Sequence, residues 1–119
     1  MDKLIFIVDD NDANLTMAAS ALEADYKVLT MPSAQKMFAL LEKKKPDLIL
    51  LDIEMPDMTG LEAIVILKEN PQNSGIPVLF ITGWSDDKLI SDAKKLGALD
   101  VINKPIVKSV LLENVKKYV

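Results

Sequence analysis

The sequence predicts an α/β fold in which five parallel strands alternate with five helices. Short apolar runs rich in β-branched residues recur along the 119 residues, and each is followed by a segment with apolar residues at helical spacing. The links between these segments are short, and no repeat or low-complexity tract interrupts them. Such alternation implies parallel strands joined by right-handed crossovers, with helices on both faces of the sheet. The length suits one domain, which we expect to span residues 1–119.

Five apolar runs account for the expected strands. The first and third are wholly apolar, as is typical of parallel strands that are buried on both faces of a sheet. The second is short, which favours a position nearer the sheet edge. In order along the chain, the predicted strands are residues 4–8, 26–29, 48–51, 76–81 and 99–102.

Helical spacing and capping residues account for the segments between the strands. Ser33 is a favoured N-cap residue for the second helix, and Pro46 ends that helix. Gly97 closes the fourth helix, because glycine readily adopts the left-handed backbone with which many helices end. In order, the predicted helices are residue 12 to about 24, a helix after Ser33 with Met37, Leu40 and Leu41 facing inward, residues 61–68, residues 86–96, and a last helix built around Val107, Leu111 and Val115.

The composition limits the chemistry that is available. Cysteine, histidine and arginine are absent, which excludes disulfides, histidine ligands, histidine general bases and guanidinium binding of phosphate. Carboxylates, hydroxyls, fourteen lysines and hard cations bound by oxygen remain. The net charge of -4 argues against general nucleic-acid binding. The N-terminal apolar run is too short for a signal peptide or membrane span, so we expect a cytoplasmic protein without nucleic-acid or membrane partners.

Polar residues stand at the carboxyl ends of the predicted strands, where open α/β sheets bind ligands. In chain order these residues are Asp9 and Asp10, Asp52, Thr82 and Lys104. We therefore expect three carboxylates, a hydroxyl and an ammonium to share one edge of the sheet. Neighbouring carboxylates repel and favour a bound cation, and oxygen ligands without histidine or cysteine favour Mg2+. A carboxylate, Mg2+, a hydroxyl and an ammonium form a sufficient set for phosphoryl transfer.

The sequence resembles the response-regulator receiver domain of two-component signalling over essentially its whole length. Each matching motif is weak alone, but together, in this order and spacing, they are highly specific. They are residues 8–10, 46–52 and 55–60, Thr82, Gly97-Ala98 and Lys104-Pro105. The likeness implies a flavodoxin-like (βα)5 sandwich whose parallel sheet has the strand order 2-1-3-4-5. It also implies a phosphoryl acceptor with at most slow autodephosphorylation, and not an enzyme.

The resemblance implies a role for each acidic residue. Asp52 is the expected phosphoacceptor, which takes its group from a phosphohistidine on a partner kinase. Mg2+ is the expected cofactor, held by Asp9, Asp10 and Asp52, with Asp10 binding it directly and Asp9 largely through water. Glu54 is expected to offer its backbone carbonyl to the same ion.

Lys104 and Thr82 complete the site that the resemblance implies. Lys104 is expected to pair with a phosphoryl oxygen, after a Lys104–Pro105 bond in the cis form. Thr82 is expected to swing its hydroxyl to another phosphoryl oxygen and to pull the loop after the fourth strand inward. Receiver domains usually carry Tyr or Phe three residues before the lysine, whereas this chain has Val101.

The expected partners are a sensor histidine kinase or phosphotransfer protein, and a downstream output domain or protein. By the same resemblance, the output surface comprises the fourth helix, the fifth strand and the fifth helix. The third helix is apolar nearly all round, including Val65 and Ile66, which suggests a covering partner or a homodimer. Trp84 has two interpretations: a partly exposed ring packed on its loop, or a ring that overhangs the site and restricts access of water to an aspartyl phosphate.

Other interpretations of these residues remain open. Asp9 and Asp10 could cap the first helix, although Asn11 and Asp12 already supply caps. A phosphatase of the haloacid dehalogenase type also uses an Asp nucleophile and Mg2+, but its signature belongs on the first strand. A receiver-like interaction module that is never phosphorylated would leave the acidic set without use. Flavodoxin-like FMN binding would need a phosphate-binding loop after the first strand, where this chain is acidic.

Overall fold

Strands and helices alternate along the described part of the chain, residues 2–119 of a computed structural model. These residues form five β-α units, as predicted, and Met1, which the predicted domain includes, lies outside the described residues. The strands are β1 (Leu4–Val8), β2 (Lys27–Met31), β3 (Leu48–Asp52), β4 (Val78–Thr82) and β5 (Asp100–Asn103). The helices are α1 (Asp12–Leu22), α2 (Ala34–Leu41), α3 (Gly60–Glu69), α4 (Asp87–Lys95) and α5 (Lys108–Lys116).

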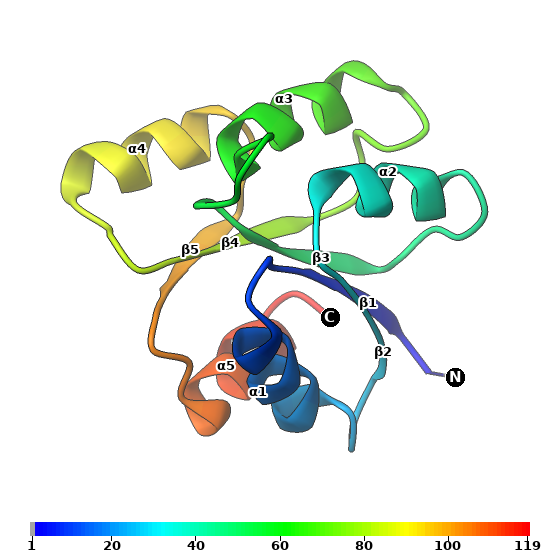
Figure 1. Ribbon diagram of the computed structural model, residues 1–119, viewed down its shortest axis with the longest axis vertical. Coiled ribbons are helices and arrows are strands. Elements are labelled where there is room, and N and C mark those ends of the chain that lie inside the picture. Colours follow the sequence, from blue (N-terminus) through cyan, green and yellow to red (C-terminus); the bar gives the residue numbers. More distant parts are fainter. Residues whose placement is uncertain (1) are drawn as a thin grey trace.

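The strands form one parallel sheet in the order β2-β1-β3-β4-β5. Figure 1 shows α1 and α5 on one face of this sheet and α2, α3 and α4 on the other. The predicted flavodoxin-like (βα)5 sandwich and its strand order are thus confirmed. The chain moves outward from β1 to β2 and then returns across β1 to β3. In open α/β sheets, ligands bind beyond the carboxyl ends of the two strands where the order reverses in this way.

Alternation along the central strands divides the core into two layers. Phe6 and Val8 of β1 pack in the layer that includes α2, α3 and α4, whereas Ile5 and Ile7 pack in the layer that includes α1 and α5. Every residue of β3 and β4 is buried, while the edge strand β2 is buried mainly at its end. Each large apolar side chain that is removed from water stabilises the fold by about 1.5–3 kcal/mol. Burial on both faces therefore holds these strands firmly in register.

Polar side chains cap the first four helices. Asn11, Ser33, Thr59 and Asp86 each accept a hydrogen bond from the backbone N–H three residues later. The prediction that Ser33 caps α2 is confirmed. Caps of this kind satisfy backbone donors that have no partner inside the helix, and each is worth about 1 kcal/mol.

Several predicted element ends were wrong. The helix α1 ends at Leu22, two residues earlier than expected, and β2 extends to Met31. The strand β4 begins at Val78 and not at residue 76, in keeping with the missing N–H of Pro77, which cannot donate to a neighbouring strand. Val107 was predicted to be one of the residues around which the last helix is built, but it precedes α5 as its N-cap and is 54% exposed. Within residues 2–119, no helix has both the length and the apolar character that crossing a bilayer requires.

Candidate functional site

Two acidic residues follow β1 directly. Asp9 is buried, and its Oδ1 accepts a hydrogen bond from the backbone N–H of Asn11 at 2.9 Å, whereas Asp10 is exposed. The side chain of Asn11 caps α1 by accepting a hydrogen bond from the N–H of Asn14 at 3.0 Å. Capping was the alternative interpretation of the acid pair, and Asn11 performs it. The carboxylate of Asp10 therefore has no capping role at α1.

The sheet register places Asp52 beside Asp9. Asp52 is the last residue of β3, and its side chain is fully buried. In the pairing of β1 with β3, Val8 lies opposite Leu51, so Asp9 and Asp52 stand one position further along two adjacent strands. Neighbouring parallel strands are about 4.8 Å apart, and matched positions project to the same face. The packing of two apolar strands thus brings two buried carboxylates together.

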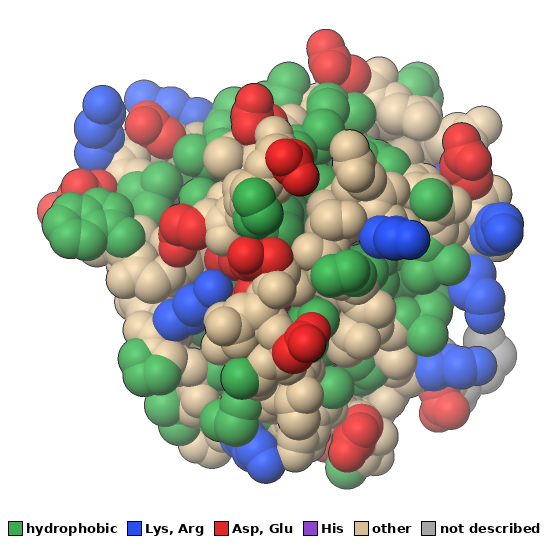
Figure 2. Space-filling view, in the orientation of Figure 1, with side chains coloured by type: hydrophobic (Ala, Val, Ile, Leu, Met, Phe, Trp, Pro, Cys, Tyr) green, Lys and Arg blue, Asp and Glu red, His purple; other side chains and the backbone are tan. Residues whose placement is uncertain are grey.

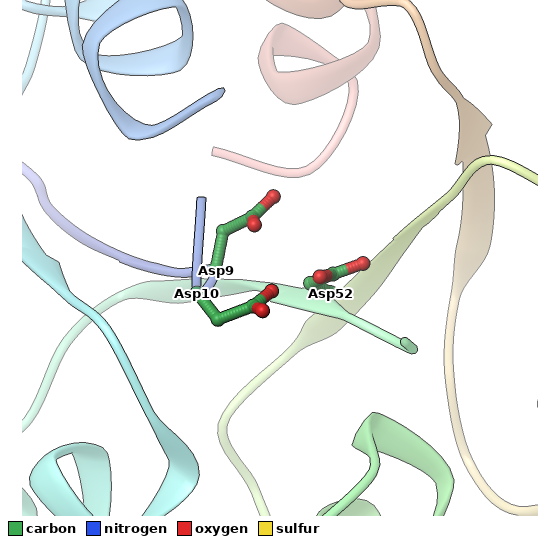
Figure 3. A group of neighbouring side chains, drawn as sticks. All are labelled: Asp9, Asp10 and Asp52. Carbon is green, nitrogen blue, oxygen red and sulfur yellow. The ribbon is translucent and has the colours of Figure 1, made fainter. Parts of the chain in front are cut away.

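Asp9, Asp10 and Asp52 form one carboxylate group. Each residue offers an oxygen atom, and these three atoms all lie within 4.8 Å of one another. Figure 3 shows the three side chains at the ends of β1 and β3, projecting toward the same side. In Figure 2, acidic side chains gather near the centre of the visible face, over this part of the fold. The expectation that the three acids share one edge of the sheet is confirmed.

Lys104 reaches this carboxylate group from the end of β5. Its Nζ lies 3.0 Å from Asp52 Oδ1 and 3.2 Å from Asp9 Oδ2. Its backbone N–H donates a hydrogen bond to the carbonyl of Thr82 at 2.8 Å, which ties the residue to the end of β4. The Lys104–Pro105 bond is cis, as the resemblance implied. One ammonium thus contacts two of the three carboxylates.

The single ammonium of Lys104 does not neutralise three carboxylates, so the site carries excess negative charge. Burial is the largest effect on Asp52 and raises its pKa from 3.8 to about 7; the hydrogen bond from Lys104 opposes this rise, and the charge of Asp9 adds to it. Burial alone would lower the pKa of Lys104, but the hydrogen bond and the charge of Asp52, together with Asp9, raise it. Asp52 therefore titrates near neutrality while Lys104 stays charged, so added positive charge would favour the ionised form of Asp52.

Two carboxylate oxygens retain acceptor capacity that fits a metal ion. Among the buried side-chain atoms of residues 2–119, Asp9 Oδ2 and Asp52 Oδ2 have no hydrogen-bond partner. Asp9 Oδ2 lies within ionic range of the Lys104 ammonium, but this contact lacks the geometry of a hydrogen bond. Leaving a buried acceptor without a partner costs about 1–3 kcal/mol. A set of carboxylates with these open positions suits a hard cation such as Mg2+.

Thr82 ends β4 with a buried side chain, and its hydroxyl contacts Glu54. Thr82 Oγ1 donates to Glu54 Oε2 at 2.6 Å, and Glu54 Oε1 accepts from the backbone N–H of Gly83 at 2.9 Å. Sequence reasoning assigned Glu54 only a backbone carbonyl, so this role of its side chain was missed. A carboxylate two residues after Asp52 was the only signal in the sequence, and no spacing rule links it to a threonine at the end of another strand.

Gly60 allows α3 to approach the strand end that carries Asp52. Its backbone N–H donates to the carbonyl of Ile53 at 2.9 Å. A Cβ atom at this position would lie 2.9 Å from Ile53 Cα and closer still to the carbonyl oxygen of Asp52. Both neighbours are backbone atoms, so neither can rotate away. Any larger residue would therefore displace α3 or the end of β3.

Apolar side chains that sequence analysis singled out are exposed. The Trp84 ring is 72% exposed, and its link to the site is the backbone, whose N–H and carbonyl both contact Thr82 Oγ1, at 3.1 and 2.8 Å. Val65 and Ile66 on α3 are 41% and 42% exposed, while other α3 residues are in the core. The helix thus carries apolar residues on its outer face, as predicted, and the Trp84 ring stands largely in solvent.

Comparison with known proteins identifies relatives across the whole chain. The family model of the response regulator receiver domain matches residues 5–116. The chain is 31% identical over 119 residues to the polar-differentiation response regulator DivK of Brucella ovis, and the match covers 99% of this chain and 97% of DivK. The structure of the chemotaxis protein CheY4 of Vibrio cholerae superimposes with a TM-score of 0.94 and 26% identity, covering 100% of both chains.

A further relative shares only part of its length with this chain. The chain is 37% identical over 102 residues to a probable cyclic di-GMP phosphodiesterase of Vibrio cholerae. That match covers 86% of this chain but 23% of the relative, so the chain spans about a quarter of that protein. The similarity therefore concerns one segment of a longer protein.

Proposed function

This chain belongs to the response regulator receiver domain family of two-component signalling, and from that premise we propose that Asp52 accepts a phosphoryl group from a phosphohistidine of a partner kinase. One observation carries the proposal: the Lys104 ammonium lies between two buried carboxylates, at 3.0 Å from Asp52 and 3.2 Å from Asp9. A structural ion pair needs only one carboxylate, whereas an acidic cluster with one ammonium suits the binding of a metal together with a phosphoryl group. We take residues 1–119 as one such domain.

The proposed transfer exchanges one bond for another. A carboxylate oxygen of Asp52 forms a bond to phosphorus while the bond from phosphorus to the imidazole nitrogen of the donor breaks, and the electron pair of that bond stays with the imidazole. Lys104 is placed to hold a phosphoryl oxygen, because its Nζ is already 3.0 Å from Asp52 Oδ1. Ammonium groups stabilise the charge that spreads over phosphoryl oxygens during transfer.

Mg2+ is the cofactor that we propose for this reaction. Asp9, Asp10 and Asp52 would hold it, with the backbone carbonyl of Glu54 as a further ligand. The two buried oxygens without hydrogen bonds, Asp9 Oδ2 and Asp52 Oδ2, support this choice. When bound, Mg2+ supplies positive charge that offsets repulsion between the carboxylates and an anionic phosphoryl group. That charge also favours the ionised, nucleophilic form of Asp52.

Thr82 is proposed to change its hydrogen bonding when Asp52 is phosphorylated. Its side chain is fully buried at the end of β4, the strand that pairs with β3, and Ile81 is matched with Asp52 in that pairing. The hydroxyl would turn toward a phosphoryl oxygen and draw the β4–α4 loop inward. Val101 replaces the usual aromatic residue, so in this chain the movement would be transmitted through the loop itself.

The proposed partners follow from this switch. A cytoplasmic histidine kinase or phosphotransfer protein would supply the phosphoryl group, and an output domain or protein would bind the surface formed by α4, β5 and α5. Apolar residues lie exposed in that region, at 45% for Leu99, 54% for Val107 and 47% for Val110. The exposed side chains of Val65 and Ile66 on α3 support a second contact surface, for a homodimer or another partner.

The experiment is intact mass spectrometry after incubation with acetyl phosphate and Mg2+. We expect the parent chain to gain one phosphoryl group and Asp52→Asn to gain none. The gain should also disappear when EDTA replaces Mg2+. An unmodified parent chain, or equal modification of Asp52→Asn, would refute the assignment. Repeated turnover of a phosphate ester, at a rate that depends on Asp52, would instead favour a phosphatase.

A further inference from the structure

The carboxylate of Glu54 joins two loops at the site. Glu54 follows Asp52 by two residues, in the loop between β3 and α3. Its Oε2 accepts the hydroxyl hydrogen of Thr82 at 2.6 Å, and its Oε1 accepts the backbone N–H of Gly83 at 2.9 Å. Both donors belong to the β4–α4 junction, so one side chain connects that junction to the loop that follows the proposed acceptor. Hydrogen bonds to a carboxylate are about twice as strong as those between neutral groups.

The Thr82 hydroxyl is fully engaged by these contacts. A hydroxyl has one hydrogen to donate, and two acceptors lie within reach of it: Glu54 Oε2 at 2.6 Å and the carbonyl of Trp84 at 2.8 Å. The same oxygen accepts the backbone N–H of Trp84 at 3.1 Å. A phosphoryl oxygen on Asp52 would therefore compete with acceptors that already hold the hydrogen, and the charged acceptor, Glu54, is the strongest of them.

We propose that Glu54 is a positioning residue that holds the Thr82 hydroxyl in the unphosphorylated state, and that a phosphoryl oxygen on Asp52 must displace the Glu54 carboxylate to bind that hydroxyl. The inference rests on the proposed function of Asp52. The Glu54 side chain then sets much of the free-energy cost of switching, because the exchange breaks the hydrogen bond between the Thr82 hydroxyl and a charged group.

Two physical effects make this exchange a switch. The phosphoryl group brings negative charge close to Glu54, and like charges at short range repel. Displacement of the carboxylate also removes the acceptor of the Gly83 N–H, so the start of the β4–α4 loop loses its tie to the β3–α3 loop. The loop movement would then begin at Gly83 and Trp84, without the aromatic residue that Val101 replaces.

The test is an NMR titration with beryllofluoride in the presence of Mg2+, because beryllofluoride binds carboxylates as an analogue of an acyl phosphate. Glu54→Gln keeps the length of the side chain and removes its charge. We expect this variant to bind beryllofluoride about fivefold more tightly, since a neutral acceptor holds the hydroxyl less strongly. The parent should show a large shift of the Gly83 amide proton on binding, as its hydrogen bond to Glu54 breaks.

A double-mutant cycle separates the hydrogen bond from the effect of charge alone. In a Thr82→Ala background, Glu54→Gln should raise the affinity for beryllofluoride clearly less than in the parent, because only the repulsion between the charges is then relieved. An equal gain in both backgrounds would show that Glu54 acts only through its charge, and would overturn the proposal. Thr82→Ser, which keeps the hydroxyl, should restore most of the dependence on Glu54.

Asp57→Asn is the matched control. Asp57 lies in the same loop, is exposed, and has a backbone φ of 69°, which asparagine also tolerates. This substitution removes the same charge without touching Thr82, so the affinity should stay within twofold of the parent. A gain equal to that of Glu54→Gln would contradict the proposal. If acetyl phosphate modifies Asp52 but Glu54→Gln binds beryllofluoride like the parent, the inference fails while the proposed function stands.

Discussion

Lys104 Nζ lies 3.0 Å from Asp52 Oδ1, although 52 residues separate the two along the chain. The contact spans β5 and β3, which are not neighbours in the sheet, because β4 lies between them. It therefore depends on the correct pairing of β4 with both β3 and β5. The same ammonium also lies 3.2 Å from Asp9, so it counters the charge of two buried acids at once.

Replacing Lys104 with Met should strengthen the binding of Mg2+. The ammonium and a divalent cation would occupy the same acidic site and repel each other, so removing the ammonium favours the metal. We expect the dissociation constant for Mg2+ to fall several-fold, as measured by calorimetric titration. Lys88→Met, an exposed residue of α4, is the control and should leave the affinity unchanged. Weaker binding in Lys104→Met would contradict the placement of the metal.

Asp52→Asn should make the metal-free protein more stable at neutral pH. The pKa of Asp52 is raised from 3.8 to about 7 by burial. Between pH 4 and pH 7 the folded state therefore holds a proton that the unfolded state has lost, so the free energy of unfolding falls as the pH rises through this window. Asparagine has no such dependence. Urea denaturation at pH 7.5 in EDTA should show a gain of up to about 4 kcal/mol over the parent.

At pH 4, the difference between Asp52→Asn and the parent should nearly vanish, because Asp52 is then protonated in the folded state and nearly half protonated in the unfolded state. A constant difference at both pH values would point to a packing effect of asparagine instead of a titration. The comparison uses the difference between the two proteins at each pH, so that effects common to both cancel.

Mg2+ should stabilise the parent protein and should do so more strongly at pH 7.5 than at pH 5. Binding to the folded state alone adds RT ln(1 + [L]/Kd), which is about 2.7 kcal/mol when the ligand exceeds its dissociation constant a hundredfold. Protons compete for Asp52 below its pKa of about 7, so the gain should shrink as the pH falls. Thermal denaturation with and without Mg2+ measures this gain. Equal stabilisation of Asp52→Asn and the parent would exclude Asp52 as a ligand.

Gly60→Ala should destabilise the fold by about 1–3 kcal/mol or more. The added Cβ would meet backbone atoms of Asp52 and Ile53 at distances that real Cβ atoms do not tolerate. Phosphorylation by acetyl phosphate should also slow, because α3 presses on the strand end that carries Asp52. Gly75→Ala is the matched control, since apart from its own chain neighbours nothing lies within 4 Å of its Cβ position. Urea denaturation of the two variants should differ clearly, and equal stabilities would disprove the steric account.

Trp84→Ala should leave the lifetime of the phosphorylated protein within about twofold of the parent. The ring is 72% exposed, and the contacts with Thr82 come from the backbone, which alanine preserves. Intact mass followed over time after removal of acetyl phosphate measures this lifetime. A several-fold faster loss would support the alternative interpretation, in which the ring closes over the site and restricts water.

The residues of the site could be named before the structure because strand ends are visible in a sequence. Asp9 follows an apolar run and so does Asp52, and parallel sheets collect their carboxyl ends along one edge. Cap residues such as Ser33 could also be predicted from the sequence, because capping depends on residues that are close together along the chain. The ends of helices and strands were predicted less accurately. The strand β4 begins after Pro77 and α1 stops two residues earlier than expected, since contacts with the rest of the fold decide where such segments end.

The amino-acid pattern on its own therefore determined the fold class, the five β-α units and the acids at the strand ends. Only the tertiary structure decided which groups touch: that Lys104 contacts both Asp9 and Asp52, and that Thr82 is held by Glu54. Periodicity and capping are properties of neighbouring residues, so they can be seen along the chain. Contacts between distant loops depend on strand register and side-chain direction, which exist only once the sheet has formed.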